Sequence, residues 1–338
     1  MHPLLPNPES HAAIGHVTGL RHETEYTAPR LGIVVPCYNE EEAIPYTINT
    51  LCTLLERLQD EQRISSDSFI LFVDDGSKDR TFRLLQQHKR DCYRVLKLSN
   101  NRGHQFALLA GLQYMTDKVD CSISIDADLQ DDLNVIPKML DLHREGYHIV
   151  CGVRSNRSTD GPFKRMTAWM FYKIMDKMGV TLIENHADFR LLSAKALQEI
   201  ARYKESNLFL RGIFTVINLR LGTISYTQGP RRQGKTKYHL GKMLSLAARG
   251  VTAFSSVPIR MITFLGIAVF LFSILLSINV LVVYMRGEVV PGWASITLPM
   301  YFFGGLQLLC LGVIGEYVAN TYTEAKRRPH YHIEEVLE

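Results

Sequence analysis

Short apolar runs alternate with segments of helical periodicity from Arg30 to about residue 155. The apolar runs are LGIVVP, SFILFVDD, YRVLKLS and VDCSISID, and each is followed by polar or turn-forming residues. Segments with apolar residues at helical spacing follow the first three runs and begin near Glu40, Asp79 and His104. Strands that alternate with helices predict a mostly parallel α/β sheet with helices on both faces.

Polar and acidic side chains follow the ends of the predicted strands. In an open α/β sheet, ligands bind beyond the carboxyl ends of the strands. The residues expected there are Pro36, Tyr38, Asn39, Glu40, Asp74, Asp75, Asp126 and Asp128. Carboxylates that converge on one crevice repel each other unless a cation or hydrogen-bond donors balance them. The sequence therefore predicts a ligand site at this edge of the sheet.

The loop SIDADLQDD carries four aspartates. Asp126, Asp128 and Gln130 alternate along the chain, so their oxygens can point the same way and form an oxygen-rich site for Mg²⁺ or Mn²⁺. A cation with so few protein ligands keeps open positions for a diphosphate. Asp131 and Asp132 begin the next helical segment, where we expect them to cap the helix rather than to bind the cation.

Other metal and phosphate motifs match the sequence less well. An EF-hand that starts at the first aspartate of the loop needs Gly and Glu where Asp131 and Pro137 stand. A dehalogenase-type phosphatase shares the DxD pattern but usually has Thr or Val in place of Gln130. A P-loop pattern occurs at 229–236, but Pro230 removes a backbone donor and the sequence after it provides no sheet. No GxGxxG indicates a dinucleotide cofactor.

Two long apolar stretches lie near the C-terminus, at Ile259–Met285 and from Trp293 to Asn320. Each exceeds the length of about 20 residues that crossing a bilayer requires. Their connection is short and basic residues flank the pair, so the positive-inside rule predicts a hairpin with both termini in the cytoplasm. Lys164–Met178 and His239–Ser256 mix apolar and basic residues, which suits helices at the membrane interface. Buried core helices are the alternative for the apolar pair and for Lys164–Met178.

Composition narrows the class of protein further. Hydrophobic residues make up 46% of the 338 residues, enough for a core, and the net charge of +4 is too mild to indicate a nucleic-acid partner. The six cysteines form no CxxC or Cys/His cluster, so we expect neither a zinc site nor a disulfide framework, and a reducing cytoplasm fits. Residues 1–29 lack the apolar core of a signal peptide and are expected to form a flexible arm.

Five motifs in order carry a family resemblance: VVPCYNEEEAIP, LFVDDGSKDRT, ISIDADLQDD, ADFRLLS and RRQGKTKY. With the two apolar stretches, they resemble the family 2 (GT-A) glycosyltransferases that act on polyprenyl phosphate. The resemblance is strongest to the bactoprenol (undecaprenyl-phosphate) glucosyltransferases and extends to the related dolichyl-phosphate mannose synthases. It covers Arg30 to the end of the chain. It implies a mostly parallel GT-A sheet flanked by helices, followed by interfacial helices and a two-helix transmembrane hairpin.

The resemblance also implies a division of the chain and roles for its residues. The expected parts are a flexible arm (1–29), a GT-A catalytic domain (30–229), a basic loop with a juxtamembrane amphipathic helix (230–258), a transmembrane hairpin (259–320) and a cytoplasmic basic tail (321–338). The donor nucleoside pocket matches Pro36, Tyr38, Asn39, Glu40 and Asp75, with Asp74 and Asp126 beside them. The metal and diphosphate site matches Asp126, Asp128 and Gln130. The basic groups for lipid phosphate and diphosphate match Arg154, Arg165, Arg231 and Lys237. The residues implied in catalysis are Asp188, an acceptor-side carboxylate or base, with Asp128 and Arg154.

The implied activity is an inverting transfer of a hexose, glucose from UDP-glucose, to undecaprenyl phosphate for cell-envelope glycan or O-antigen modification. The implied setting is the bacterial inner membrane, which the chain spans more than once, with the catalytic domain and both termini cytoplasmic. A homo-oligomer and a small membrane flippase are the expected partners. The alternatives are the same chemistry with GDP-mannose, UDP-GlcNAc or a formamido-arabinose donor, and a non-catalytic nucleotide-binding membrane subunit. A processive synthase is disfavoured because the sequence has no QxxRW and too few spans.

Overall fold

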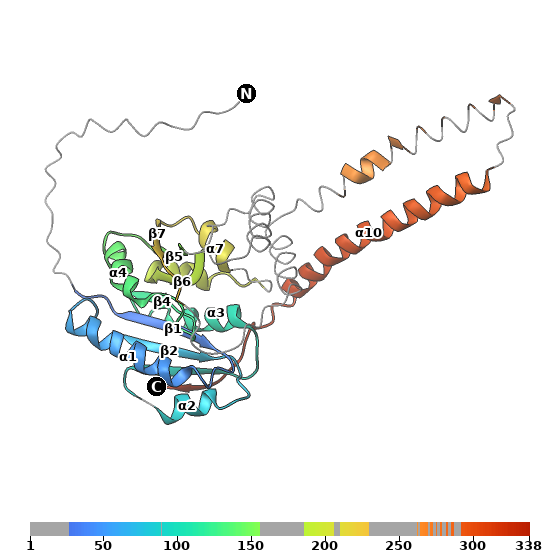
Figure 1. Cartoon of the computed structure of the whole chain (residues 1–338). Coiled ribbons are helices and arrows are strands. Elements are labelled where there is room, and N and C mark those ends of the chain that lie inside the picture. Colours follow the sequence, from blue (N-terminus) through green and yellow to red (C-terminus); the bar gives the residue numbers. More distant parts are fainter. Residues whose placement is uncertain are drawn as a thin grey trace, which may run out of the picture.

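The computed structural model of the chain describes residues 27–88, 90–155, 186–205, 210–229 and 292–338, with scattered positions between 262 and 286. Most of the expected N-terminal arm, both expected interfacial segments and most of the first expected span lie outside the described residues. Eight strands form one sheet in the order β7-β5-β6-β4-β1-β2-β3-β8 (Figure 1). The mostly parallel α/β sheet expected from the sequence is therefore present.

The sheet and its helices follow the alternation of apolar runs. The strands are β1 (Leu31–Cys37), β2 (Phe69–Asp74), β3 (Tyr93–Leu98), β4 (Cys121–Ser124), β5 (Ile149–Arg154), β6 (His186–Ser193), β7 (Leu221–Tyr226) and β8 (Ile333–Leu337). The helices are α1 (Ile44–Asp60), α2 (Thr81–Gln87), α3 (His104–Met115), the short 3₁₀ helix η1 (Leu133–Val135), α4 (Ile136–Arg144), α6 (Ala194–Ala201), α7 (Leu210–Val216) and α10 (Trp293–Ala325).

Strands β4, β1, β2 and β3 form the parallel half of the sheet. Their carboxyl ends therefore lie along one edge, where Cys37 pairs with Asp74. Strand β6 runs antiparallel between β4 and β5, and Arg190 pairs with Ser124 at the carboxyl end of β4. The beginning of β6 consequently reaches the same edge, although β6 follows β4 by some sixty residues in the sequence.

Helices cover both faces of the sheet. Buried side chains of α1, α2 and α4 pack on one face, and those of α3, α6 and α7 pack on the other. The predicted apolar stripe of the first helix is confirmed by the burial of Ile44, Ile48, Leu51, Leu54, Leu55 and Leu58. The helix begins at Ile44 rather than near Glu40, because the carbonyl of Glu40 accepts the N–H groups of Ala43 and Ile44 in a turn. Pro45 then occupies the first helical turn, where its missing N–H costs nothing.

Gly111 lets α3 approach the centre of the sheet. A Cβ atom at this position would lie 2.4 Å from Val34 Cγ1 and 3.0 Å from Val73 Cγ2. Both valines are fully buried in neighbouring strands and cannot move away. We expect Gly111→Ala to lower the free energy of unfolding by about 1–3 kcal/mol, as overpacked cores do. Chemical unfolding measures this loss. Gly304→Ala in α10, where a Cβ meets nothing within 4 Å, is the control, and equal stability of the two variants would contradict the close approach.

The C-terminal part of the chain differs from the expected tail. Helix α10 has 33 residues and continues to Ala325, past the end of the expected span, and projects from the domain (Figure 1). The expected tail of 321–338 then returns to the sheet, where β8 pairs antiparallel with β3. In the part of the chain that the structure describes, no helix combines the length and apolar character needed to cross a membrane.

A disulfide was not expected from the cysteine spacing, and this expectation was wrong for one pair. Cys52 in α1 and Cys92 just before β3 are bonded, with their Cα atoms 6.1 Å apart. The two residues are 40 positions apart in sequence and come together only because β2 and the helices beside it fold back. Cys37, Cys121 and Cys151 are buried free thiols.

Candidate active site

The turns after β1 and β2 lie together at the carboxyl edge of the sheet, and we call the region between the strand-end loops at this edge the crevice. Asn39, whose φ is +53°, donates its backbone N–H to Ser77 Oγ (3.0 Å) and accepts the N–H of Lys78 through Oδ1 (2.8 Å). The N–H of Glu40 donates to Thr81 Oγ1 (2.9 Å). These bonds tie the two turns together. Two residues expected at the nucleoside pocket, Asn39 and Glu40, therefore lie in one pair of joined turns, and the Asn39 side chain takes part in joining them.

Pro36 lies within β1 rather than beyond it, and it pairs with Val73 of β2. A proline is tolerated in a central strand only where no partner needs its N–H. Strand β4 ends at Ser124, which pairs with Val34, so the ladder on that side of β1 has ended before Pro36. The chain can thus place a proline at the floor of the crevice without losing a hydrogen bond.

Two aspartates at the end of β2 are buried: Asp74 is the last residue of the strand, and Asp75 follows it. Asp74 is fully buried and accepts the N–H of Ser77 (3.3 Å). The carboxylate of Asp75 accepts the N–H groups of Arg102 (2.7 Å) and Gly103 (2.8 Å) in the loop after β3. Burial raises the pKa of both carboxyl groups, and these N–H bonds oppose the rise at Asp75. Asp75 therefore joins the end of β2 to the start of α3.

The acidic loop after β4 also borders the crevice. Asp128 accepts the N–H of Gln130 (3.4 Å), and Leu129 between them has a φ of +47°. Gln130 is held from the other side, because Gln228 Nε2 donates to its side-chain oxygen (2.8 Å) and the N–H of Gly229 donates to its carbonyl (2.9 Å). The chain thus leaves β7 in contact with the acidic loop. Arg231 and Lys237 follow directly but lie outside the described residues, as does Arg165.

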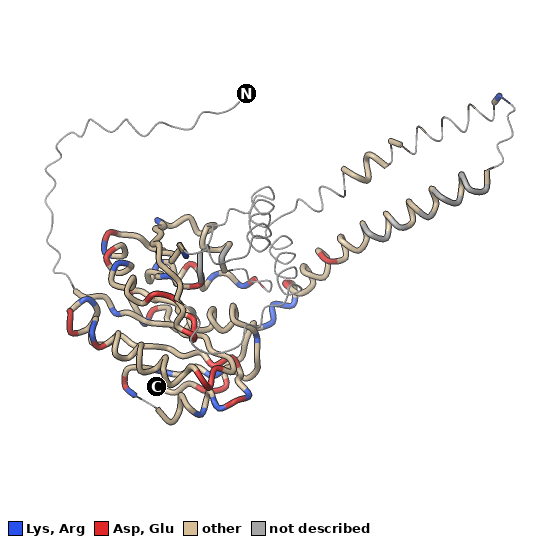
Figure 2. The backbone as a smooth tube through the Cα atoms, viewed as in Figure 1, with Lys and Arg blue, Asp and Glu red and all other residues tan. Residues whose placement is uncertain are grey.

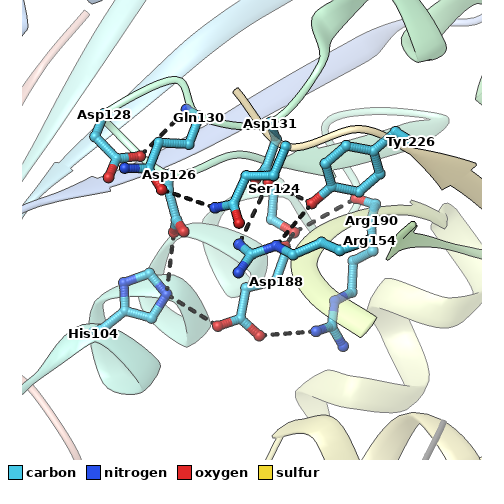
Figure 3. Close-up of polar contacts among 11 residues, drawn as sticks. His104, Ser124, Asp126, Asp128, Gln130, Asp131, Arg154, Asp188, Arg190 and Tyr226 are labelled. Atoms are coloured by element: carbon cyan, nitrogen blue, oxygen red, sulfur yellow. Dashed lines mark hydrogen bonds and ion pairs between the residues drawn. The ribbon is translucent and has the colours of Figure 1, made fainter. Parts of the chain in front are cut away.

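Asp188 faces this loop from β6. His104 Nε2 lies 3.6 Å from Asp126 Oδ1 and 3.5 Å from Asp188 Oδ2, and the three side chains converge in Figure 3. Arg190, only 1% exposed, donates to Asp188 Oδ1 (2.9 Å), and its guanidinium stacks 4.1 Å from the centre of the Phe214 ring. Ser124 donates its hydroxyl to the carbonyl of Asp188. The expected acceptor-side carboxylate is therefore placed beside the expected metal site.

Asp131 is not a helix cap, which corrects the sequence-based expectation. It is 4% exposed and accepts the hydroxyl of Tyr226, while Arg154 Nη2 lies 3.5 Å from the same carboxylate (Figure 3). Burial raises the pKa of Asp131 to about 6. Asp132 does cap η1, because its side chain accepts the N–H of Asn134 (3.0 Å). The two neighbours differ because the chain turns between them, which aims one side chain inward and the other toward solvent.

Arg154, at the end of β5, is the expected basic residue that the structure describes beside the acidic loop. Its Nε donates to the hydroxyl of Tyr226 (3.2 Å), and its side chain stays about one-third exposed. A guanidinium that is oriented by two partners and still reaches solvent is suited to bind a phosphate. Arg154 therefore fits the role that the sequence assigned to it.

Tyr226→Phe tests this arrangement. The variant removes the hydroxyl donor of buried Asp131 and one partner of Arg154, so we expect the free energy of unfolding to fall by about 1–3 kcal/mol. Catalytic activity should fall with it because Arg154 loses its orientation. Urea unfolding and activity are measured on the same preparation. Tyr114→Phe, which loses a hydrogen bond to the exposed Glu338, is the matched control, and a loss as large there would argue against a special role for Tyr226.

The charge balance favours a cation at the acidic loop. Burial raises the pKa of Asp126, the charges of Asp188 and Asp128 raise it further, and His104 opposes the rise. Among the described residues, no group of three His, Cys, Asp or Glu side chains is placed to hold a metal ion. Asp126, Asp128 and the Gln130 amide provide oxygen donors only, and the amide oxygen keeps a second lone pair beside its bond from Gln228. This donor set fits Mg²⁺ or Mn²⁺ that takes its other ligands from a substrate.

Three functional neighbours were not expected from the sequence: His104, Arg190 and Tyr226. Arg190 follows Asp188 by two residues, so the period of a strand would have placed both side chains on one face. Tyr226 is the last residue of β7, and His104 begins α3 after the loop that follows β3, so both belong to the region where the rule for ligand sites applies. Each residue thus had a signal in the sequence, but the sequence did not show that β6 pairs with β4 and β7 with β5.

A cavity of about 700 Å³ borders the acidic loop and shares Gln130 with the expected metal site. The outer face of α1 and residues 129–134 line it, together with Thr227 and Gly229. It does not contain Asp126, Asp128 or Asp188, and we assign the chemistry to the crevice, where the charged side chains converge.

The sheet, its acidic strand-end loop and the opposed Asp188 are those of a GT-A glycosyltransferase. The sequence profile of glycosyl transferase family 2 matches residues 32–201, and the chain belongs to this family of transferase enzymes. It is 49% identical to the uncharacterized glycosyltransferase YkoT of Bacillus subtilis (strain 168) over 308 residues, 90% of this chain and 91% of that protein.

A second relative is the prophage bactoprenol glucosyl transferase homolog of Escherichia coli (strain K12). It is 37% identical over 314 residues, 91% of this chain and 99% of that protein. The solved structure of mannosyl-3-phosphoglycerate synthase from Rubrobacter xylanophilus matches with a TM-score of 0.46 and 17% identity, over 67% of this chain and 72% of that chain. That likeness is too distant to carry an argument, so the family assignment rests on the sequence.

Proposed function

We propose that the protein is an inverting glycosyltransferase that transfers glucose from UDP-glucose to undecaprenyl phosphate at the cytoplasmic face of a bacterial inner membrane. The glucosyl lipid then serves as a sugar donor for cell-envelope glycans such as a modified O-antigen. The bactoprenol glucosyl transferase homolog, which aligns over nearly its whole length, supports both the sugar and the lipid.

One observation carries this proposal: two carboxylates that are far apart in the sequence converge from neighbouring strands at the carboxyl edge of the sheet. Asp126 follows β4, Asp188 lies in β6, and His104 contacts both. A donor diphosphate on the Asp126 side and an acceptor on the Asp188 side would bring the anomeric carbon between them. Transferases depend on such placement of two substrates, because orientation replaces a bimolecular encounter.

The transfer forms a bond between a lipid phosphate oxygen and the anomeric carbon. The bond from that carbon to the diphosphate breaks, and its electron pair leaves with UDP. A divalent cation held by Asp126, Asp128 and Gln130 would neutralise charge on the departing diphosphate. Arg154 reaches the same side and binds phosphate oxygens.

Asp188 orients the acceptor or a sugar hydroxyl and does not need to remove a proton. A phosphate monoester is already largely ionised near pH 7 and is a competent nucleophile without a strong base. The contact with Arg190 holds the Asp188 carboxylate in one direction. We therefore expect substitution of Asp128 on the donor side to lower the rate more than substitution of Asp188.

The surface of α10 supports the membrane part of the proposal. No Lys, Arg, Asp or Glu occurs from Trp293 to Gly315, and a basic run at 326–328 lies where the helix meets the domain (Figure 2). Large apolar side chains on the helix are more than half exposed, namely Ile296, Met300, Phe302, Leu311 and Val318. Exposed apolar surface of this extent marks a site of contact with lipid or another apolar partner. Recovery of the full chain in the soluble fraction after cell lysis would overturn the membrane assignment.

The reaction is tested with purified full-length protein, undecaprenyl phosphate and a panel of nucleotide sugars. We expect a glucosyl lipid and free UDP from UDP-glucose in the presence of Mg²⁺ or Mn²⁺, and no product with EDTA. A product from GDP-mannose, UDP-GlcNAc or a formamido-arabinose donor alone would replace the sugar assignment. No glycolipid from any donor would leave a nucleotide-binding membrane subunit as the better description.

A further inference from the structure

The residues that follow α10 return to the edge of the crevice. Because β8 runs antiparallel to β3, its first residue, Ile333, pairs with Leu98 at the carboxyl end of β3. The residues just before β8 therefore lie beside the loop that follows β3. The end of a helix outside the catalytic domain is thus joined, within a few residues, to the edge of the candidate active site (Figure 1).

Residues 330–332, which we call the C-terminal clasp, contact both ends of residues 99–106. We call these residues the loop 99–106, a name that includes the first turn of α3. The N–H and the hydroxyl of Ser99 donate to the carbonyl of His332, at 3.0 and 3.3 Å. The ring of His330 stacks on Phe106, with centroids 5.2 Å apart and planes 19° apart. Tyr331 donates its hydroxyl to Gln113 further along α3. The clasp thus connects the end of β3 with the first turn of α3.

The loop 99–106 supplies several of the groups that shape the crevice. Arg102 and Gly103 donate their N–H groups to Asp75, and His104 reaches both Asp126 and Asp188. Gly103 has a φ of +93°, a conformation that residues with a side chain rarely adopt. Glycine adopts this conformation without strain but is free to adopt others. The contacts of the clasp at Ser99 and Phe106 limit this freedom on both sides of Gly103.

We propose that the C-terminal clasp is part of the donor site and that His330 is a positioning residue. It holds the loop 99–106 so that His104 and the Gly103 N–H keep their places around Asp75 and Asp126. This inference rests on the proposed function and extends the donor site to the end of the chain. The C-terminal clasp then links the position of α10 to the geometry of the loop 99–106.

The test compares three variants of the full-length protein. His330→Ala removes the ring stacked on Phe106, and His330→Phe keeps an aromatic ring there. Glu334→Gln removes the ion pair that joins β8 to Lys97 of β3 (2.7 Å).

We expect His330→Ala to raise the KM for UDP-glucose by about 2- to 10-fold, the scale of an aromatic pair. The kcat and the KM for undecaprenyl phosphate should change by less than about twofold, because Arg190 and Ser124 still hold Asp188 on the acceptor side. His330→Phe should restore most of the donor affinity, and Glu334→Gln should match the wild type.

The outcomes separate this inference from the proposed function. If the wild type is active, an unchanged donor KM in His330→Ala, or an equal rise in donor and acceptor KM, overturns the inference alone. A similar rise in Glu334→Gln overturns it as well, since general weakening of β8 would then suffice. If no donor gives a glycolipid, the proposed function fails. The clasp is then tested by calorimetric binding of UDP with Mn²⁺ to the wild type and to His330→Ala. Equal Kd values for wild type and His330→Ala, including no binding to either, would then reject the clasp.

Discussion

Asp128→Asn is expected to lower kcat by about 100-fold or more, the scale on which a single charge-stabilising group acts in a reaction centre. Asp128 lies on the donor side of the crevice, where we expect a cation and the leaving diphosphate. Asparagine keeps the shape of the side chain but removes its charge, so binding of a divalent ion weakens. Asp188→Asn should lose less, within about tenfold, because that residue orients a group and does not remove a proton.

The comparison is made at saturating Mn²⁺ and at saturating concentrations of both substrates. Asp132→Asn is the matched control from the same loop, because Asp132 caps η1 and an asparagine at this position can accept the same N–H. We expect its activity to equal that of the wild type. Equal residual activities of Asp128→Asn and Asp188→Asn would contradict the division of roles.

Arg190→Met is expected to lower the free energy of unfolding by about 3 kcal/mol, the usual result when one partner of a buried ion pair is removed. Arg190 is 1% exposed and Asp188 only 18% exposed, so water replaces the lost guanidinium only in part. Methionine preserves the volume beside Phe214, which limits the effect of a cavity. The loss of stability should therefore arise chiefly because the Asp188 carboxylate no longer has its buried partner. Chemical unfolding measures this loss.

A double variant isolates this cause. Arg190→Met combined with Asp188→Asn removes both charges, and we expect it to recover a large part of the lost stability. Arg202→Met is the surface control, because its pair with Glu199 is exposed and should contribute less than about 1 kcal/mol. A double variant no more stable than Arg190→Met alone would show that packing, and not the charge of Asp188, accounts for the loss.

The sequence predicted most of the parallel half of the sheet. Strands β1 to β4 are local runs of apolar residues, and α1 shows its buried stripe in its own spacing, so neighbours along the chain suffice to specify them. The rule for strand ends then located Asp75 and Asp126 correctly at one edge. The role of Asp131 could not be predicted, because Tyr226, its partner, is 95 residues away in the sequence.

The pairings of β6, β7 and β8 were likewise not predictable from local pattern. A strand of eight residues can join either edge of a sheet or enter between two strands, and its periodicity is the same in each case. Only the folded chain shows that β6 enters beside β4 and that β8 closes the edge beside β3. The contacts of Asp188 and of the C-terminal clasp with the crevice follow from those two choices.

The sequence by itself determined the α/β class, the family, and the aspartates that follow β2 and β4. These properties depend on residue types at short spacing, which each segment carries wherever it lies. The tertiary structure decided that His104 contacts both Asp126 and Asp188 and that Arg190 pairs with Asp188. It also decided that the end of the chain lies beside the loop 99–106. The reason is physical: each of these contacts joins residues far apart in sequence, and its formation depends on the path of the whole chain.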